Sequence, residues 1–178
     1  MGERHYAFLR AINTGNRRLT NEQLLAPFVE LGLADVAAYQ AAGNVTFRAE
    51  PAAIDERDLE TALAGAYGFE TPTFVRSAAE IAAIVETQPF TADEVAATAG
   101  RVQVTFLRST PSDEQVRAIL DLVPPEDRVR VIGREWYWLP VEGLSTSAMP
   151  VDRIERALGE MTMRTLGTVR RMSAKFGG

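Results

Sequence analysis

The sequence contains no cysteine and a single histidine, His5. Without cysteine the chain forms no disulfide, no thiolate nucleophile and no cysteine-ligated metal site. With one histidine a His-rich metal site is excluded, and a Ser-His-Asp triad would have to use His5, which falls in an expected strand. We therefore predict no bound metal and no cofactor. The residues leave open whether the protein is an enzyme, and they identify no catalytic residue.

Long apolar runs are also absent. No stretch approaches the roughly 18 apolar residues that a membrane-spanning helix needs. The first residues, MGERHYAF, lack the pattern of a cleaved signal peptide. The 178 residues are 46% hydrophobic and 24% charged, which is typical of one large or two small folded domains. Together these features predict a cytoplasmic protein without a membrane partner.

The net charge of −5 is unevenly distributed along the chain. Residues 1–18 carry four arginines and one acid, and residues 160–178 carry four basic residues and one acid, whereas residues 19–100 carry 13 acids and three arginines. The acidic middle argues against a broad nucleic-acid surface. Two basic chain ends instead suit a small anionic ligand if the fold brings them together.

Strand and helix signals follow one another in the same order twice. In the first half, alternating or fully apolar runs predict strands, and capping residues such as Thr20 and Asp55 predict helix starts. The expected order is strand 5–12, helix from Thr20 to Gly32, strands 35–40 and 44–49, helix from Asp55 to Gly68 and strand 71–76. The second half repeats it with strand 101–107, a helix capped by Ser112, a hairpin turning at Gly133-Arg134, helix 150–158, strand 161–165 and a last helix 167–175.

This pattern predicts an α+β protein made of two ferredoxin-like subdomains, each with the order β-α-β-β-α-β. The expected segments are residues 1–76 for the first subdomain, 77–100 for a helical connector, and 101–178 for the second subdomain with a C-terminal helix.

The segment LRAINTGN, residues 9–16, resembles the LRGINVGG signature of the domain-of-unknown-function family 1697. Four further segments resemble that family in the same order: NEQLLAPFVELGLADVAAYQAAGNVTF, VRSAAEIAAIVETQPF, GREWYWLP and MRTLGTVRRM. The resemblance implies a bacterial protein with two ferredoxin-like subdomains, and it implies no established activity. The chain departs from the family at several polar positions, with Ala41-Ala42 in place of Gln-Ser and Ala148 in place of Lys.

The loop after the first strand holds Arg10, Asn13 and Gly15, with Arg17 and Arg18 beside them. Amides in such a loop, a helix start at its end and nearby arginines suit a phosphate or carboxylate. An ordinary strand-to-helix turn is the alternative interpretation.

Asn44 opens the third expected strand, which in this fold runs antiparallel beside the first. We therefore expect Asn44 at the same sheet edge as Asn13, although a hairpin turn at Gly43-Asn44 is commonly structural. Arg164 and Arg171 lie in the basic C-terminal segment, where a solvated helix face is the alternative. The predicted ligand site lies at the seam between the subdomains and consists of Arg10, Asn13, Gly15, Asn44, Arg164 and Arg171.

Two other functions stay open at this stage. Ferredoxin-like sheets have edge strands that pair with partners, which favours a protein-interaction or dimerisation module, as a monomer or a homodimer. Domains of this plan also bind RNA through exposed sheet aromatics, here Tyr6 and Phe8. Trp136 and Trp138 share one strand face, which predicts core or interdomain packing, with a stacking platform for a base or ring as the alternative. The acids from Asp55 to Glu60 are interpreted as structural, because acids suit a helix start.

Overall fold

The computed structural model describes residues 2–15, 18–40, 42–50, 54–98 and 100–177. Its helices and strands alternate in the order that the sequence pattern predicts. They are β1 Glu3–Leu9, α1 Asn21–Glu30, β2 Ala34–Ala38, β3 Asn44–Ala49, α2 Glu56–Tyr67, β4 Thr73–Ser77, α3 Ala78–Glu86, α4 Ala92–Ala96, β5 Gln103–Leu107, α5 Asp113–Leu120, β6 Arg128–Ile132, β7 Glu135–Leu139, α6 Val151–Leu158, β8 Met161–Thr165 and α7 Leu166–Phe176.

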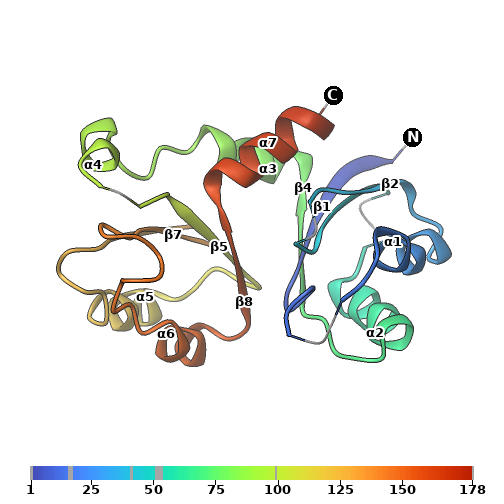
Figure 1. The fold of residues 1–178 in the computed structure, drawn as a ribbon, viewed down its shortest axis with the longest axis horizontal. Coiled ribbons are helices and arrows are strands. Elements are labelled where there is room, and N and C mark those ends of the chain that lie inside the picture. The colour runs from blue at the N-terminus through green and yellow to red at the C-terminus, as the bar shows by residue number, and fades with distance from the viewer. Residues whose placement is uncertain (1, 16–17, 41, 51–53, 99, 178) are drawn as a thin grey trace. The chain divides into compact units, whose positions relative to one another are not determined.

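The strands form two four-stranded antiparallel sheets (Figure 1). The first sheet has the order β2-β3-β1-β4, and the second has the order β6-β7-β5-β8. When the four strands of each sheet are numbered in chain order, both sheets have the order 2-3-1-4. The first and third strands of each sheet therefore lie in its centre, as the ferredoxin-like pattern requires. The predicted α+β fold class, with two such sheets and a C-terminal helix, is confirmed.

Contacts within the chain group it into two compact units. One unit comprises Met1–Ile84 and Met172–Gly178, and the other comprises Val85–Arg171. The last part of α7 therefore belongs to the first unit. The predicted subdomain limits, 1–76, 77–100 and 101–178, stay a prediction, because they concern which segments fold independently.

In the first unit, α1 and α2 cover one face of the sheet (Figure 1). Their starts are fixed by Thr20, which forms a capping box with Gln23, and by Asp55, which accepts hydrogen bonds from two first-turn amides. The core between the helices and the sheet consists of Ala7, Leu9, Ile12, Leu24, Phe28, Val45, Phe47, Leu59, Leu63 and Val75.

In the second unit, α5 and α6 pack on one sheet face around two stacked tryptophans. The rings of Trp136 and Trp138 lie 6.2 Å apart at an interplanar angle of 9°. Their side chains are 0% and 2% exposed. The core-packing interpretation of this pair is thus confirmed, and the stacking-platform interpretation is wrong because no ring face is open to solvent.

Strand β1 ends at Leu9, three residues earlier than the apolar run predicts. Ala11 has a φ of 59°, which is incompatible with an extended strand. Ile12 nevertheless stays buried at 6% exposure. The chain therefore leaves the sheet while its apolar side chains stay in the core. Within the described residues, no helix has the length and apolar character that crossing a membrane requires.

Candidate functional site

The loop between β1 and α1 has an unusual backbone conformation. Ala11, Asn13 and Gly15 have φ values of 59°, 58° and 57°, whereas Ile12 and Thr14 between them do not have a positive φ. Two of the three left-handed residues are not glycine. Ala11 costs roughly 1–2 kcal/mol relative to a right-handed backbone, whereas asparagine adopts this conformation more readily. Where the intervening residues are right-handed, such an alternation turns successive amides toward one side, which is the anion-binding concavity known as a nest.

Side chains of the loop hold this conformation against α1. The Asn13 Oδ1 atom accepts a hydrogen bond from the Leu19 amide at 2.9 Å. The Thr14 hydroxyl donates to the Ala11 carbonyl at 3.2 Å. At the start of the loop, the Arg10 amide donates to the Pro72 carbonyl at 2.8 Å, and the Arg10 side chain is partly exposed. The loop is thus tied at both ends, while Thr14 and Gly15 face solvent.

The hairpin before β3 lies directly beside this loop. Asn44 pairs with Phe8 across β1 and β3, and the Leu9 amide donates to the Gly43 carbonyl at 2.7 Å. A Cβ atom on Gly43 would lie 2.9 Å from the Leu9 carbonyl oxygen, so this position requires glycine. The Asn44 side chain is fully buried and its Nδ2 donates to the Tyr39 carbonyl at 3.1 Å. This hydrogen bond holds the hairpin, and the place of Asn44 beside the loop is as expected, while its role as a ligand stays a prediction.

Arg164 and Arg171 belong to the second compact unit. The Arg164 guanidinium donates to the Thr162 hydroxyl at 2.9 Å and to the Met163 carbonyl at 2.7 Å. Its burial lowers the pKa of Arg164 to about 10. A cation is disfavoured in such a place unless an anion or strong hydrogen bonds compensate.

Arg171 folds back over the first turn of α7. Its guanidinium donates to the Thr168 hydroxyl at 3.3 Å, and that hydroxyl lies 2.8 Å from the Thr165 hydroxyl. A Cβ atom on Gly167 would lie 3.4 Å from Arg171 Nη1, so the guanidinium passes close to this glycine. A joint site of these arginines with the β1–α1 loop stays a prediction. Asn16, Arg17 and Ala41 lie outside the described residues.

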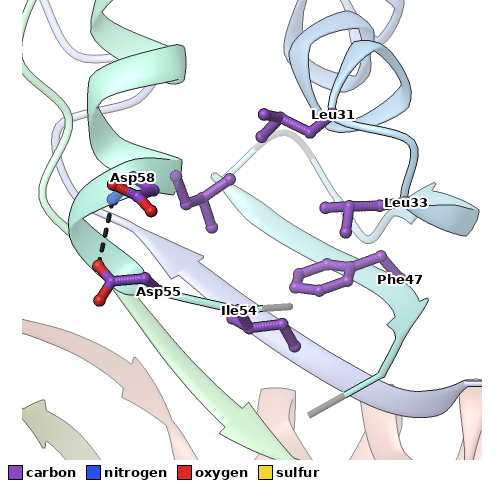
Figure 2. A pocket seen from close by; sticks show the side chains of 7 residues that line it. Leu31, Leu33, Phe47, Ile54, Asp55 and Asp58 are labelled. Atoms are coloured by element: carbon purple, nitrogen blue, oxygen red, sulfur yellow. Dashed lines mark hydrogen bonds between the residues drawn. The ribbon is translucent and has the colours of Figure 1, made fainter. Parts of the chain in front are cut away.

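Among the hollows on the surface of the described residues, two illustrate their range of size. The first lies between the end of α1, β3 and the start of α2, where Leu31, Leu33, Phe47 and Ile54 converge (Figure 2). Its volume of about 80 Å³ is well below the roughly 300–1,000 Å³ of ordinary ligand sites. The second, of about 520 Å³, lies in the second unit and is lined by Asp93, Glu94, Ala97, Thr98, Glu126, Arg128 and Val141.

A buried polar cluster in the second unit was not predicted from the sequence. Asp127, 4% exposed, accepts hydrogen bonds from the Trp138 indole at 2.9 Å, the Ser147 hydroxyl at 2.5 Å and the Val141 amide at 3.0 Å. Ser147 in turn accepts from the Met149 amide at 3.1 Å. The cluster anchors the segment between β7 and α6, so its role is structural. Nothing in the local sequence signals it, because Asp127 and its partners are 11 to 20 residues apart.

Comparison with known proteins decides the family. Residues 3–137 match the family model described as Protein of unknown function (DUF1697). The chain belongs to the DUF1697 family. The fold of this DUF1697 protein is also similar to the solved structure of the conserved bacterial protein SP0830 from Streptococcus pneumoniae, with a TM-score of 0.71 and 20% sequence identity over 99% of each chain. At that identity the likeness shows the fold alone. A search of curated proteins found no match.

Proposed function

We propose that this DUF1697 protein binds a small anionic ligand, bearing phosphate or carboxylate, at the β1–α1 loop. The observation that carries the proposal is the alternation of left-handed residues at Ala11, Asn13 and Gly15. Strained backbone positions persist where the surrounding structure enforces them, and they are concentrated at ligand clamps and active sites. Asn13 and Thr14 supply that enforcement through their hydrogen bonds.

The electrostatics of the loop favour an anion. The amides of residues 12–15 follow the alternating backbone, and the positive end of the α1 dipole follows at Thr20. Arg10 adds a full charge at the other end of the loop. Arg164 and Arg171, in the second unit, stay predictions from the sequence, and they are tested by separate variants. The proposal assigns no reaction.

RNA binding through the first sheet receives no support from the exposure of its aromatics. Tyr6 and Phe8 are 1% and 0% exposed, so no base stacks on them in this conformation. Strand pairing at β4 is also disfavoured, because side chains of α2 occupy two of its amides. These observations disfavour base stacking on Tyr6 and Phe8 and strand pairing at β4.

The test is a thermal-shift screen with phosphorylated and carboxylated metabolites at millimolar concentration, followed by calorimetric titration of each hit. A ligand that binds the native state raises the melting temperature in proportion to the logarithm of its concentration. We expect Arg10→Gln to weaken binding about tenfold, and Arg153→Gln, an exposed arginine of α6, to leave it unchanged. Arg164→Gln and Arg171→Gln test the two further ligands. A flat screen contradicts the proposal.

A further inference from the structure

Two arginines face each other at the opposite end of β1 from the β1–α1 loop. Arg4 of β1 is the direct cross-strand partner of Arg48 in β3. Their side chains are 13% and 24% exposed. Like charges directly opposite each other in a sheet are destabilising, and more so where water is partly excluded. An anion beside the pair is therefore favourable, in addition to the Gly2 carbonyl that accepts from Arg48 Nη1 at 3.3 Å.

Asp35 of β2 supplies the carboxylate that now lies between them. Arg48 Nε donates to Asp35 Oδ2 at 3.1 Å, and Arg4 Nη1 donates to the Asp35 carbonyl at 3.0 Å. Arg4 Nη2 lies 3.7 Å from the same Oδ2. The Asp35 side chain is nevertheless 59% exposed, and its backbone is left-handed with a φ of 47°. The register of β2 against β3 also shifts between Ala34 and Ala37.

Polar groups beside the arginine pair lack partners within the described residues. They are Arg4 Nε and the Thr46 hydroxyl, and both atoms are buried. Thr46 is 0% exposed and lies on the same sheet face as the arginines, two residues before Arg48 and opposite Tyr6. Unsatisfied buried polar groups are rare in native proteins and call for an explanation such as an ion. The positive charge of the two arginines also acts on Tyr6. Burial raises the pKa of Tyr6, and the charges of Arg4 and Arg48 partly offset that rise.

We propose that Arg4, Arg48 and Thr46 form a second oxyanion-binding site, in which the Asp35 carboxylate holds the place of the ligand and moves out when the ligand binds. Guanidinium groups match the oxygens of carboxylates and phosphates in a two-pronged geometry. An occupant with at least two acceptor oxygens satisfies both arginines at once, and it offers acceptors to Arg4 Nε and the Thr46 hydroxyl. Asp35 competes because it presents the same carboxylate chemistry from an exposed position.

The inference does not depend on the β1–α1 loop. From Arg4 to Leu9 the strand rises about 16 Å, so the two sites are too far apart to share one small ion. Variants of Arg10 therefore report on the loop alone, and variants of Arg48 report on the arginine pair alone.

The experiment titrates the full-length protein with inorganic phosphate and, separately, with malonate, at constant ionic strength maintained with sodium chloride. Calorimetry measures affinity, and the nitrogen–proton signal of Arg4 Nε in an NMR spectrum reports occupancy of this site. Asp35→Asn removes the competing charge while keeping a residue that accepts a left-handed backbone. We expect it to bind about tenfold more tightly than the parent, and Arg48→Gln about tenfold more weakly. Arg153→Gln is the matched control and is expected to equal the parent.

Each outcome decides the inference. A saturable shift of the Arg4 Nε signal with phosphate, malonate or both, enhanced in Asp35→Asn, supports it and identifies which oxyanion class is preferred. An Arg4 signal that does not move, or Asp35→Asn binding no better than the parent, overturns it. If Arg48→Gln fails to fold, the Asp35→Asn arm decides alone. Binding that Arg10→Gln abolishes, with no shift of the Arg4 Nε signal, supports the proposed function and overturns this inference. Binding that shifts the Arg4 Nε signal and that Arg10→Gln leaves unchanged supports this inference and contradicts the proposed function.

Discussion

The Glu60 carboxylate in α2 accepts a hydrogen bond from the Thr73 amide in β4 at 2.6 Å. One turn earlier, Glu56 accepts from the Val75 amide at 2.7 Å. Because β4 is an edge strand, alternate amides point away from the sheet and offer a template for another strand. The two glutamates occupy two successive amides of this kind, so the helix closes the edge that a partner strand would use.

Removing this closure is expected to cost stability and to promote association. Thr73 is fully buried, so Glu60→Ala deprives a buried amide of this acceptor, at a cost of about 1–3 kcal/mol in the free energy of unfolding. The double variant Glu56→Ala/Glu60→Ala is expected to raise the mass in solution with concentration. Urea unfolding and light scattering measure the two effects. Glu114→Ala, at an exposed position of α5, is the control. If the double variant has the same stability and the same mass in solution as Glu114→Ala, the edge-closing role is refuted.

The buried carboxylate of Asp127 predicts a second stability effect. Asp127→Asn weakens charge-assisted hydrogen bonds to the Trp138 indole and the Ser147 hydroxyl, so we expect a loss of about 2 kcal/mol. Ser147→Ala removes one of these donors and is expected to cost about 1 kcal/mol. Denaturant unfolding followed by tryptophan fluorescence measures both. Asp127→Asn with parental stability and an unchanged Trp138 emission would contradict the anchoring role.

Tyr67 predicts a pH dependence at the alkaline end. Its hydroxyl donates to the Leu24 carbonyl at 2.6 Å, and burial raises the pKa of Tyr67 well above its usual range. The unfolded phenol loses its proton near pH 10 while the folded one keeps it. Above about pH 10 the unfolded state therefore binds fewer protons, and stability falls as pH rises.

The variant Tyr67→Phe separates this effect from others. It loses one hydrogen bond, about 1 kcal/mol at neutral pH, and its stability is expected to fall less steeply above pH 10 than that of the parent. Urea unfolding at neutral and alkaline pH measures the difference. Identical slopes for parent and variant would show that Tyr67 does not contribute.

The strained backbone at Ala11 predicts a variant that is more stable than the parent. Ala11 has a φ of 59°, a conformation that glycine adopts without steric cost. Ala11→Gly is therefore expected to raise the free energy of unfolding by up to about 1 kcal/mol. Ala66→Gly, at an exposed position inside α2, is expected to lower it by about 0.5–1 kcal/mol. Thermal unfolding measures the change in stability of each variant. If Ala11→Gly lowers stability as Ala66→Gly does, the Ala11 backbone is not left-handed in solution.

Local signals in the sequence suffice for much of the fold. The capping boxes of Thr20 and Ser112 mark helix starts, and both are present in the structure. Strand order follows once those elements are placed, because the split βαβ pattern leaves few topologies. The end of β1 is the exception. The apolar run continues to Ile12, but the chain turns at Ala11, and no local propensity indicates a positive φ at alanine.

The candidate sites depend on contacts that local patterns do not contain. The loop residues Arg10, Asn13 and Gly15 are adjacent in sequence, so composition alone was enough to select them. Arg4 and Arg48 are 44 residues apart and meet Asp35 through the register of three strands. The helix start at Asp55 predicts a structural role for Glu56 and Glu60, which is confirmed, but their partners lie 19 and 13 residues away in β4.

The central claim is that the β1–α1 loop binds an anion through its amides. The most direct measurement is a nitrogen–proton NMR titration of the full-length protein with inorganic phosphate, with sodium chloride as the ionic-strength control. We expect the amide signals of Ile12, Thr14 and Gly15 to shift saturably with phosphate and Arg10→Gln to weaken this response. Amide signals that stay in place, or that move equally with chloride, would contradict it.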